Sequence, residues 1–345
     1  MTGLAALNYN RGRTAHSLFR IPVENNGDGF KCQIKLNSER AKLIQESLVV
    51  TWDELPMVQK GIVEAVDAFL HELCNSDMPF GGKIFIGIGN FCQVAPVVPR
   101  AGRMAIVLES IKSFLIWDSF EVCDLQQPIR DSHDPEYSRL MDDIGDGISD
   151  ENINLPLLKI THKIDDAINF IFPETILNNS TACQKRAILS DAIDLYSTDN
   201  LANNDTNHIQ QRNTITVELL NSFNTSGIPK HCLILKKVTI QNPTTGCIVH
   251  LPRITFLFQI PQFPFKISHH QFPLRLAYSS TFNSSQELTL NRVALDLRTP
   301  VFSYGQLYTA LTRVRQRNHI LILAENNYSL NLFTTKNVVY SELLE

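Results

Sequence analysis

The clearest hydrophobic pattern in the chain predicts a strand, a helix and a second strand. Residues 48–50 form a short apolar run of strand type. Residues 58–74 carry apolar side chains at helical spacing and therefore predict an amphipathic helix. Residues 83–88 form a second apolar run, which ends at a Gly-Asn pair. A strand, a helix and a strand within about forty residues are typical of a parallel βαβ unit.

Polar side chains follow both predicted strands. Asp53 and Glu54 come after the first strand, and Asn90 and Gln93 come after the second. Ligands of parallel sheets bind beyond the carboxyl ends of the strands, where these side chains are expected to meet. There the aspartate could hold Mg²⁺ and the glutamate could polarise an attacking water. An Asp-Glu pair also ends many strands as solvated charges, and a lone Gln in a loop is ordinarily a surface residue.

The pattern after the βαβ unit is weaker, and two arginines in this part of the chain are of interest. It predicts loops around residues 195–226, strands at 274–277 and 293–297, and a helix at 306–314. Arg130 and Arg313 have the chemistry of phosphate clamps, because a guanidinium group matches phosphate oxygens and keeps its charge. Any one arginine alone is more often part of a surface ion pair.

Composition indicates a globular chain with an uneven charge. Apolar residues make up 43% and charged residues 19% of the 345 residues, and the net charge is −4. Residues 131–175 hold eleven acidic and three basic side chains, whereas residues 266–317 hold seven basic and two acidic ones. The seven cysteines contain no C-x-x-C pair, which favours reduced thiols in an intracellular protein. No apolar run is long enough to predict a membrane span.

Several segments, in sequence order, resemble the motifs of the Pif1-like DNA helicases, including those of Helitron transposons. The similarity covers roughly residues 1–147 and 266–325. The segments that carry it are Thr2 to Ala6, Gly12 to Ser17, Trp52-Asp53-Glu54-Leu55-Pro56-Met57, Phe80-Gly81-Gly82-Lys83, Gln93 to Pro99, Gln271 to Ala277, Thr281 to Gln286, Pro300 to Tyr308 and Ala310 to Val314.

This resemblance implies an α/β fold of two RecA-like domains of the P-loop NTPase type, each a parallel sheet with helices on both faces. We expect the first domain at residues 1–147, a loop-rich connection at 148–209, a remnant of an inserted subdomain at 210–250, the second domain at 251–325 and a tail at 326–345.

The resemblance also implies an activity and a set of site residues. The family couples ATP hydrolysis, with Mg²⁺, to 5′-to-3′ unwinding of DNA in repair, recombination or telomere maintenance, which implies a nuclear location. By motif, Asp53 would hold Mg²⁺, Glu54 would activate water, Gln93 would sense the γ-phosphate, and Arg130 and Arg313 would contact phosphates. Single-stranded or forked DNA would be held by Thr2, Gly3, Arg13, Thr14, His16, Ser17, Thr281, Asn283, Ser285 and Gln286.

The chain departs from the family pattern in its phosphate-binding parts. The phosphate loop, G-x-x-G-x-G-K-[ST], does not occur in the 345 residues, and pieces of the second domain are missing. This loop supplies backbone amides, a lysine and a hydroxyl to nucleotide and metal. Asn90, Pro128, Ser284 and Glu287 stand where the family has Asp, Asn, Lys and Gly. We therefore expect a truncated, diverged helicase with impaired ATP hydrolysis; the alternatives are a non-enzymatic single-stranded DNA-binding or interaction protein and a transposon-derived fragment.

Overall fold

The structure is a computed structural model that divides into two compact units. The larger unit contains residues 1–193 and 278–345, and the smaller one contains residues 194–277. Each unit is described by itself. The residues that the structure describes are 6, 9–23, 29–98, 101–148, 152–173, 186–189, 252–259, 266–272, 279–325 and 333–344.

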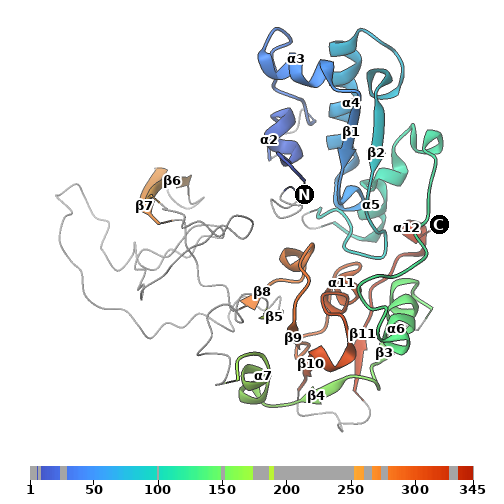
Figure 1. The fold of residues 1–345 in the computed structure, drawn as a ribbon, viewed down its shortest axis with the longest axis vertical. Helices are drawn as coiled ribbons and strands as arrows, with labels where there is room; N and C mark the ends of the chain where they lie inside the picture. The colour runs from blue at the N-terminus through green and yellow to red at the C-terminus, as the bar shows by residue number, and fades with distance from the viewer. Residues whose placement is uncertain are drawn as a thin grey trace, which may run out of the picture. The chain divides into compact units, whose positions relative to one another are not determined.

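The N-terminal part of the larger unit contains the predicted βαβ unit (Figure 1). Strands β1 (Val49–Trp52) and β2 (Ile84–Gly87) pair in parallel, with Val49 opposite Ile84. Helix α4 (Lys60–Cys74) connects them and buries the apolar face that its periodicity predicts. The prediction of a parallel βαβ unit is thus confirmed. This part of the chain also contains α2 (Ala15–Phe19), α3 (Glu39–Glu46), α5 (Arg103–Leu108) and the 3₁₀ turns Leu55–Met57, Pro79–Gly82, Ile111–Ser113 and Trp117–Ser119.

The C-terminal part of the larger unit is built on a five-stranded parallel sheet. The strand order is β4-β10-β9-β5-β8. Its strands are β4 (Lys159–Thr161), β5 (Arg186–Leu189), β8 (Ser279–Ser280), β9 (Arg292–Asp296) and β10 (Ile320–Leu323). Strand β10 is buried along its whole length and almost entirely apolar, as expected for a central parallel strand. The strand predicted at residues 293–297 is β9, whereas the strand predicted at residues 274–277 lies outside the described residues.

Helices and a small second sheet complete this part of the chain. Helix α7 contacts β9 and β10, and α11 contacts α6. Strands β3 and β11 pair antiparallel. The helix predicted at residues 306–314 is the shorter α11, because the chain turns at Thr312. The bounds are α6 (Pro135–Gly145), α7 (Ile164–Ile171), α11 (Gln306–Leu311), α12 (Ser341–Leu344), β3 (Asn152–Asn154), β11 (Thr334–Lys336) and the 3₁₀ turns Asn283–Ser285 and Arg317–His319.

Two hydrophobic cores divide the larger unit into two lobes. In the first core α4 packs on β1 and on the segments before them. Along the sequence, its buried members extend from Ala15 to Phe114. The second core surrounds β9, β10 and α11 and extends from Tyr137 to Phe333. We call the parts around these cores the N-terminal lobe (residues 9–120) and the C-terminal lobe (residues 131–173, 186–189 and 279–344). Within the described residues, no helix has the length and apolar character needed to span a bilayer.

In the smaller unit the structure describes one antiparallel hairpin. It consists of β6 (Ile254–Gln259) and β7 (Lys266–Gln271), with Ile254 opposite Gln271. The subdomain remnant predicted at residues 210–250 lies outside the described residues.

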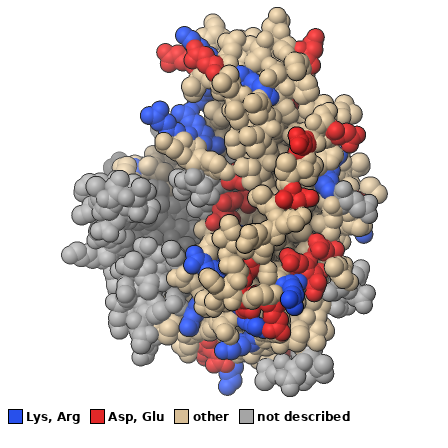
Figure 2. Space-filling model, turned by 45° about the vertical axis from the view of Figure 1, so that its right-hand side comes forward, with Lys and Arg blue, Asp and Glu red and all other residues tan. Residues whose placement is uncertain are grey.

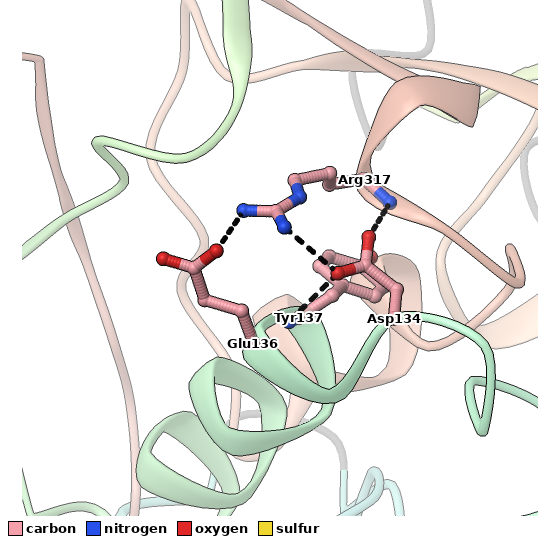
Figure 3. Close-up of polar contacts among 4 residues, drawn as sticks. All are labelled: Asp134, Glu136, Tyr137 and Arg317. Carbon is pink, nitrogen blue, oxygen red and sulfur yellow. Dashed lines mark hydrogen bonds and ion pairs between the residues drawn. The ribbon is translucent and has the colours of Figure 1, made fainter.

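Asp134 fastens the start of α6 to the segment that follows α11 (Figure 3). Its carboxylate caps the helix by accepting a hydrogen bond from the Tyr137 amide, at 3.3 Å. The same carboxylate accepts the Arg317 amide, at 3.1 Å, and lies 3.1 Å from the Arg317 guanidinium group. Arg317 also pairs with Glu136, at 2.6 Å. One carboxylate therefore holds together two segments that are far apart in the sequence.

We predict that Asp134→Ala lowers the free energy of unfolding by about 1 to 2 kcal/mol, because the variant loses an N-cap together with the contact to Arg317. Urea denaturation measures this change. The matched control is Asp143→Ala on the exposed side of the same helix, which we expect to change stability by less than about 0.5 kcal/mol. Equal losses in the two variants would contradict this role of Asp134.

Candidate functional site

The acidic pair lies in a tight turn at the carboxyl end of β1. Glu54 is buried and has left-handed backbone angles (φ 53°), so the chain reverses sharply after the strand. Asp53 accepts a hydrogen bond from the Glu54 amide, at 3.0 Å, and another from the hydroxyl of Tyr9, at 3.1 Å. The Leu55 amide donates to the carbonyl of Ile88, at 2.9 Å, which ties the turn to the end of β2. The two carboxylates are thereby fixed beside the edge where the sequence predicts a ligand.

A third carboxylate, that of Glu287, joins this pair from the C-terminal lobe. Glu287 follows the 3₁₀ turn Asn283–Ser285 and also has a left-handed backbone (φ 66°). Glu287 lies within electrostatic range of both Glu54 and Asp53. Burial, and then Glu287, raises the pKa of Glu54 to about 8, and the same two causes raise the pKa of Asp53. A buried glutamate is therefore flanked by two partly exposed acidic groups.

Arg313 lies within electrostatic range of Glu54 and Glu287. Its side chain is 1% exposed, and its guanidinium group donates to the Thr309 carbonyl, at 2.7 Å, and to the Thr312 hydroxyl, at 2.8 Å. Burial, and then the nearby charge of Arg130, lowers the pKa of Arg313 to about 10, which still leaves it protonated at neutral pH. Arg130 donates to the Thr312 carbonyl, at 2.8 Å. The two predicted phosphate arginines thus meet at the end of α11.

Gln93 lies in a seam between the lobes, where the loop of residues 90–93 packs against α11. Gln286 donates to the Gln93 side-chain oxygen, at 3.3 Å, and Asn90 donates to the Tyr308 hydroxyl, at 3.0 Å. The Tyr304 hydroxyl donates to the Phe91 carbonyl, at 2.7 Å. We call this set of contacts the seam.

Gly305 makes the closest approach in the seam. It adopts left-handed angles (φ 67°), and a Cβ atom there would lie 2.4 Å from the carbonyl carbon and oxygen of Gln93. Only glycine satisfies both conditions without moving the backbone.

The predicted DNA-contacting residues fall into three groups. Thr2 and Gly3 lie outside the described residues. Around α2, Arg13 and Ser17 are exposed, His16 is partly buried, and Thr14 caps the helix by accepting the Ser17 amide, at 3.2 Å. In the segment before Glu287, Thr281 is exposed and Asn283 is half-buried, whereas Ser285 and Gln286 are fully buried.

Other residues of the site were not predicted as functional from the sequence. Tyr9 and Tyr308 bring their hydroxyl groups to Asp53 and Asn90, but single tyrosines carry no periodic signal. Glu287 is noticeable in the sequence only as a departure from the family pattern. Its contact with Glu54 depends on how the two lobes pack, and the sequence does not encode that packing locally.

The described residues fit a Mg²⁺ ligand better than they fit a triphosphate. Mg²⁺ at nucleotide sites takes one or two carboxylates together with substrate phosphates, and Asp53 offers one such carboxylate. Within the described ranges, no group of three or more His, Cys, Asp or Glu side chains is arranged to hold a metal ion. Phosphates would face Glu54 and Glu287, while Arg313 already donates to protein oxygens. An ionised carboxylate here would repel phosphates, so the charge of this arrangement disfavours a triphosphate.

We predict that Glu54 makes the protein less stable as the pH rises. Because the pKa of Glu54 is raised on folding from 4.5 to about 8, its contribution is fully present below about pH 4.5 and is lost as the pH rises through about 8. Glu54→Gln removes this dependence. Denaturation at several pH values should show that the stability difference, variant minus wild type, grows between these limits. The control is Glu325→Gln, at an exposed glutamate, and a constant difference for Glu54→Gln would contradict the prediction.

The comparisons with known proteins agree with one another. The family model described as PIF1-like helicase matches residues 1–153. A curated relative, the ATP-dependent DNA helicase PIF1 of Candida albicans, is 25% identical over 154 residues. That alignment covers 42% of this chain but only 17% of the relative.

Solved structures of Pif1 helicases have a fold similar to that of this chain. A crystal structure of Pif1 helicase from Bacteroides in complex with ADP-AlF3 and ssDNA has a TM-score of 0.60 and 20% identity, over 99% of this chain and 84% of that chain. Pif1 helicase from Candida albicans has a TM-score of 0.57 and 17% identity, over 99% and 86%. The mixed α/β architecture with parallel sheets is that of RecA-like domains. The chain is thus similar to the Pif1-like helicases, with the family model matching its first 153 residues.

Proposed function

We propose that the chain is a DNA-binding member of the Pif1-like helicase family and that its 345 residues alone do not turn over ATP. The observation that carries this proposal is that Arg313, the predicted phosphate arginine, is 1% exposed and donates to the oxygens of Thr309 and Thr312. Glu54 would have to act as an ionised base on a water beside the γ-phosphate. In this site Glu54 lies close to a second carboxylate, that of Glu287, and the Arg313 guanidinium group donates hydrogen bonds to protein oxygens.

Exposed basic side chains of the N-terminal lobe support the DNA-binding part. Arg11, Arg13 and Arg20 are all exposed around α2, and none of the three is ion-paired within the part of the chain that the structure describes. In Figure 2, a group of basic side chains lies at the left of the upper part, below a group of acidic ones, and basic and acidic side chains are mixed in the lower part. Unpaired guanidinium groups suit sequence-independent contact with phosphates. Structural relatives include Pif1 bound to ssDNA and Pif1 at forked dsDNA.

ATP-dependent 5′-to-3′ unwinding is the second candidate function. It is favoured by the placement of Asp53 at the end of β1 and of Gln93 in the seam, as a nucleotide-driven motor would require. A nuclear location would follow from a DNA partner under either function.

We predict that the purified 345-residue chain shows no ATP hydrolysis above background, with or without single-stranded DNA, because its sequence contains no phosphate loop. A phosphate-release assay with Mg²⁺-ATP measures this. Glu54→Gln serves as the reference for background. Turnover by the wild type that disappears in Glu54→Gln would establish the second candidate function instead.

We predict salt-dependent binding of an oligothymidine by the wild type, weakened in Arg13→Ala. The loss of one phosphate contact should lower the slope of log affinity against log salt by about 0.7. Fluorescence anisotropy over a salt series gives this slope. Arg139→Ala, at an exposed arginine on α6, is the matched control and should leave the slope unchanged. Absence of binding by the wild type at low salt would contradict the DNA-binding function.

A further inference from the structure

A C-terminal segment of the larger unit connects the two lobes. We call residues 337–344 the strap. Its first half belongs to the C-terminal lobe: the Asn337 side chain is buried and donates to the Ile144 carbonyl on α6, at 2.9 Å. The Gly305 amide donates to the Val338 carbonyl, at 3.0 Å. Strand β11, which precedes the strap, pairs with β3. Buried polar contacts therefore fix this half of the strap to the C-terminal lobe.

The second half of the strap meets the N-terminal lobe at Arg103, the first residue of α5 (Figure 1). The Arg103 guanidinium group lies 2.5 Å from a carboxylate oxygen of Glu342, on α12. Its carbon also lies over the ring of Tyr340, 5.1 Å from the ring centroid. The side chains of Arg103 and Glu342 are 50% and 42% exposed, so the ion pair is accessible to salt. This polar contact adds to the burial of Leu343 on the same helix.

Tyr340 connects this ion pair to the seam. Its ring packs on the ring of Tyr304, with 5.1 Å between the two centroids. Tyr304 is buried, and its hydroxyl donates to the Phe91 carbonyl, at 2.7 Å, which is one of the contacts of the seam. Arg103, Tyr340 and Tyr304 therefore form one stack that begins at the exposed surface and ends at the loop of residues 90–93. A cation over an aromatic ring is attracted to it, so Arg103 helps to keep Tyr340 against Tyr304.

We propose that the strap is a salt-sensitive device that keeps the two lobes together, and that releasing its contact with Arg103 shifts the lobes towards separation at the seam. The difference between its two ends supports this role. The end at Asn337 is buried, whereas the end at Glu342 depends in part on an exposed ion pair, which is weak and screened by salt. Because Gln93 lies in the seam, the strap controls access to that side chain. The inference goes beyond the proposed function, since lobe separation needs neither ATP nor DNA.

Two variants weaken the exposed end of the strap. Glu342→Gln removes the ion pair and keeps the shape of the side chain. Tyr340→Leu removes the ring that carries the contact to the seam. The matched control is Lys42→Gln on α3, which removes another exposed ion pair, the one with Glu46. All variants are made in the full 345-residue chain.

The accessibility of Cys92 reports on the seam. Cys92 is partly buried in the loop of residues 90–93, and a Cβ atom on Gly145 of α6 would lie 3.1 Å from its Cβ atom. Cys123 is exposed and serves as the internal reference. Maleimide labelling followed by mass spectrometry gives the ratio of the two labelling rates, Cys92 to Cys123.

We expect this ratio to rise about twofold to fivefold in Glu342→Gln at low salt, as the modest strength of exposed ion pairs implies. Tyr340→Leu should raise it further, because it removes the whole stack. Lys42→Gln should leave the ratio at the wild-type value. A ratio in Glu342→Gln equal to that of the wild type would overturn the proposal.

Salt provides a readout that a purely structural role of the strap would not change. Raising NaCl from about 0.01 M to about 1 M shortens the Debye length from about 30 Å to about 3 Å. The labelling ratio should therefore rise with salt in the wild type and in Lys42→Gln, and should hardly change in Glu342→Gln. An equal rise with salt in the wild type and in Glu342→Gln would also overturn the proposal.

Discussion

The burial of one positive charge organises the C-terminal lobe and its contact with the rest of the larger unit. A buried guanidinium group is tolerated only when oxygen atoms surround it. Arg313 meets this condition with the carbonyl of Thr309 and the hydroxyl of Thr312, and with acidic groups nearby. The turn that ends α11, the segment leading to Glu287 and the acidic pair after β1 are each positioned in relation to that charge.

The burial of Arg313 also bears on how the charge of this site compares with that of a phosphate site. Asp53, Glu54, Gln93, Arg130 and Arg313 come from widely separated segments, yet they converge where the strands end and the lobes meet. What differs is the sign of the local charge. A site for phosphates should offer excess positive charge, whereas here Glu287 adds a further carboxylate to the acidic pair.

Much of the framework could be predicted from the sequence, and the failures have physical reasons. The strand, helix and strand around α4 follow from apolar periodicity, which acts locally and leaves a clear signal. The short length of α11 was missed, because its end depends on Thr312 and Arg313 turning towards the lobe interior. The proximity of Glu287 to Glu54 was missed as well, because it brings together residues more than two hundred positions apart through lobe packing. The predicted domain boundaries stay predictions.

Gly305 carries a consequence for how related sequences are interpreted. A methyl group at this position would overlap the backbone of Gln93, so the spacing of the two lobes is limited by the absence of a side chain. Any relative with another residue at the equivalent position must hold its lobes farther apart or route the loop of residues 90–93 differently. The identity of this one residue can therefore serve as a marker in sequence surveys, sorting relatives by lobe spacing before their structures are determined.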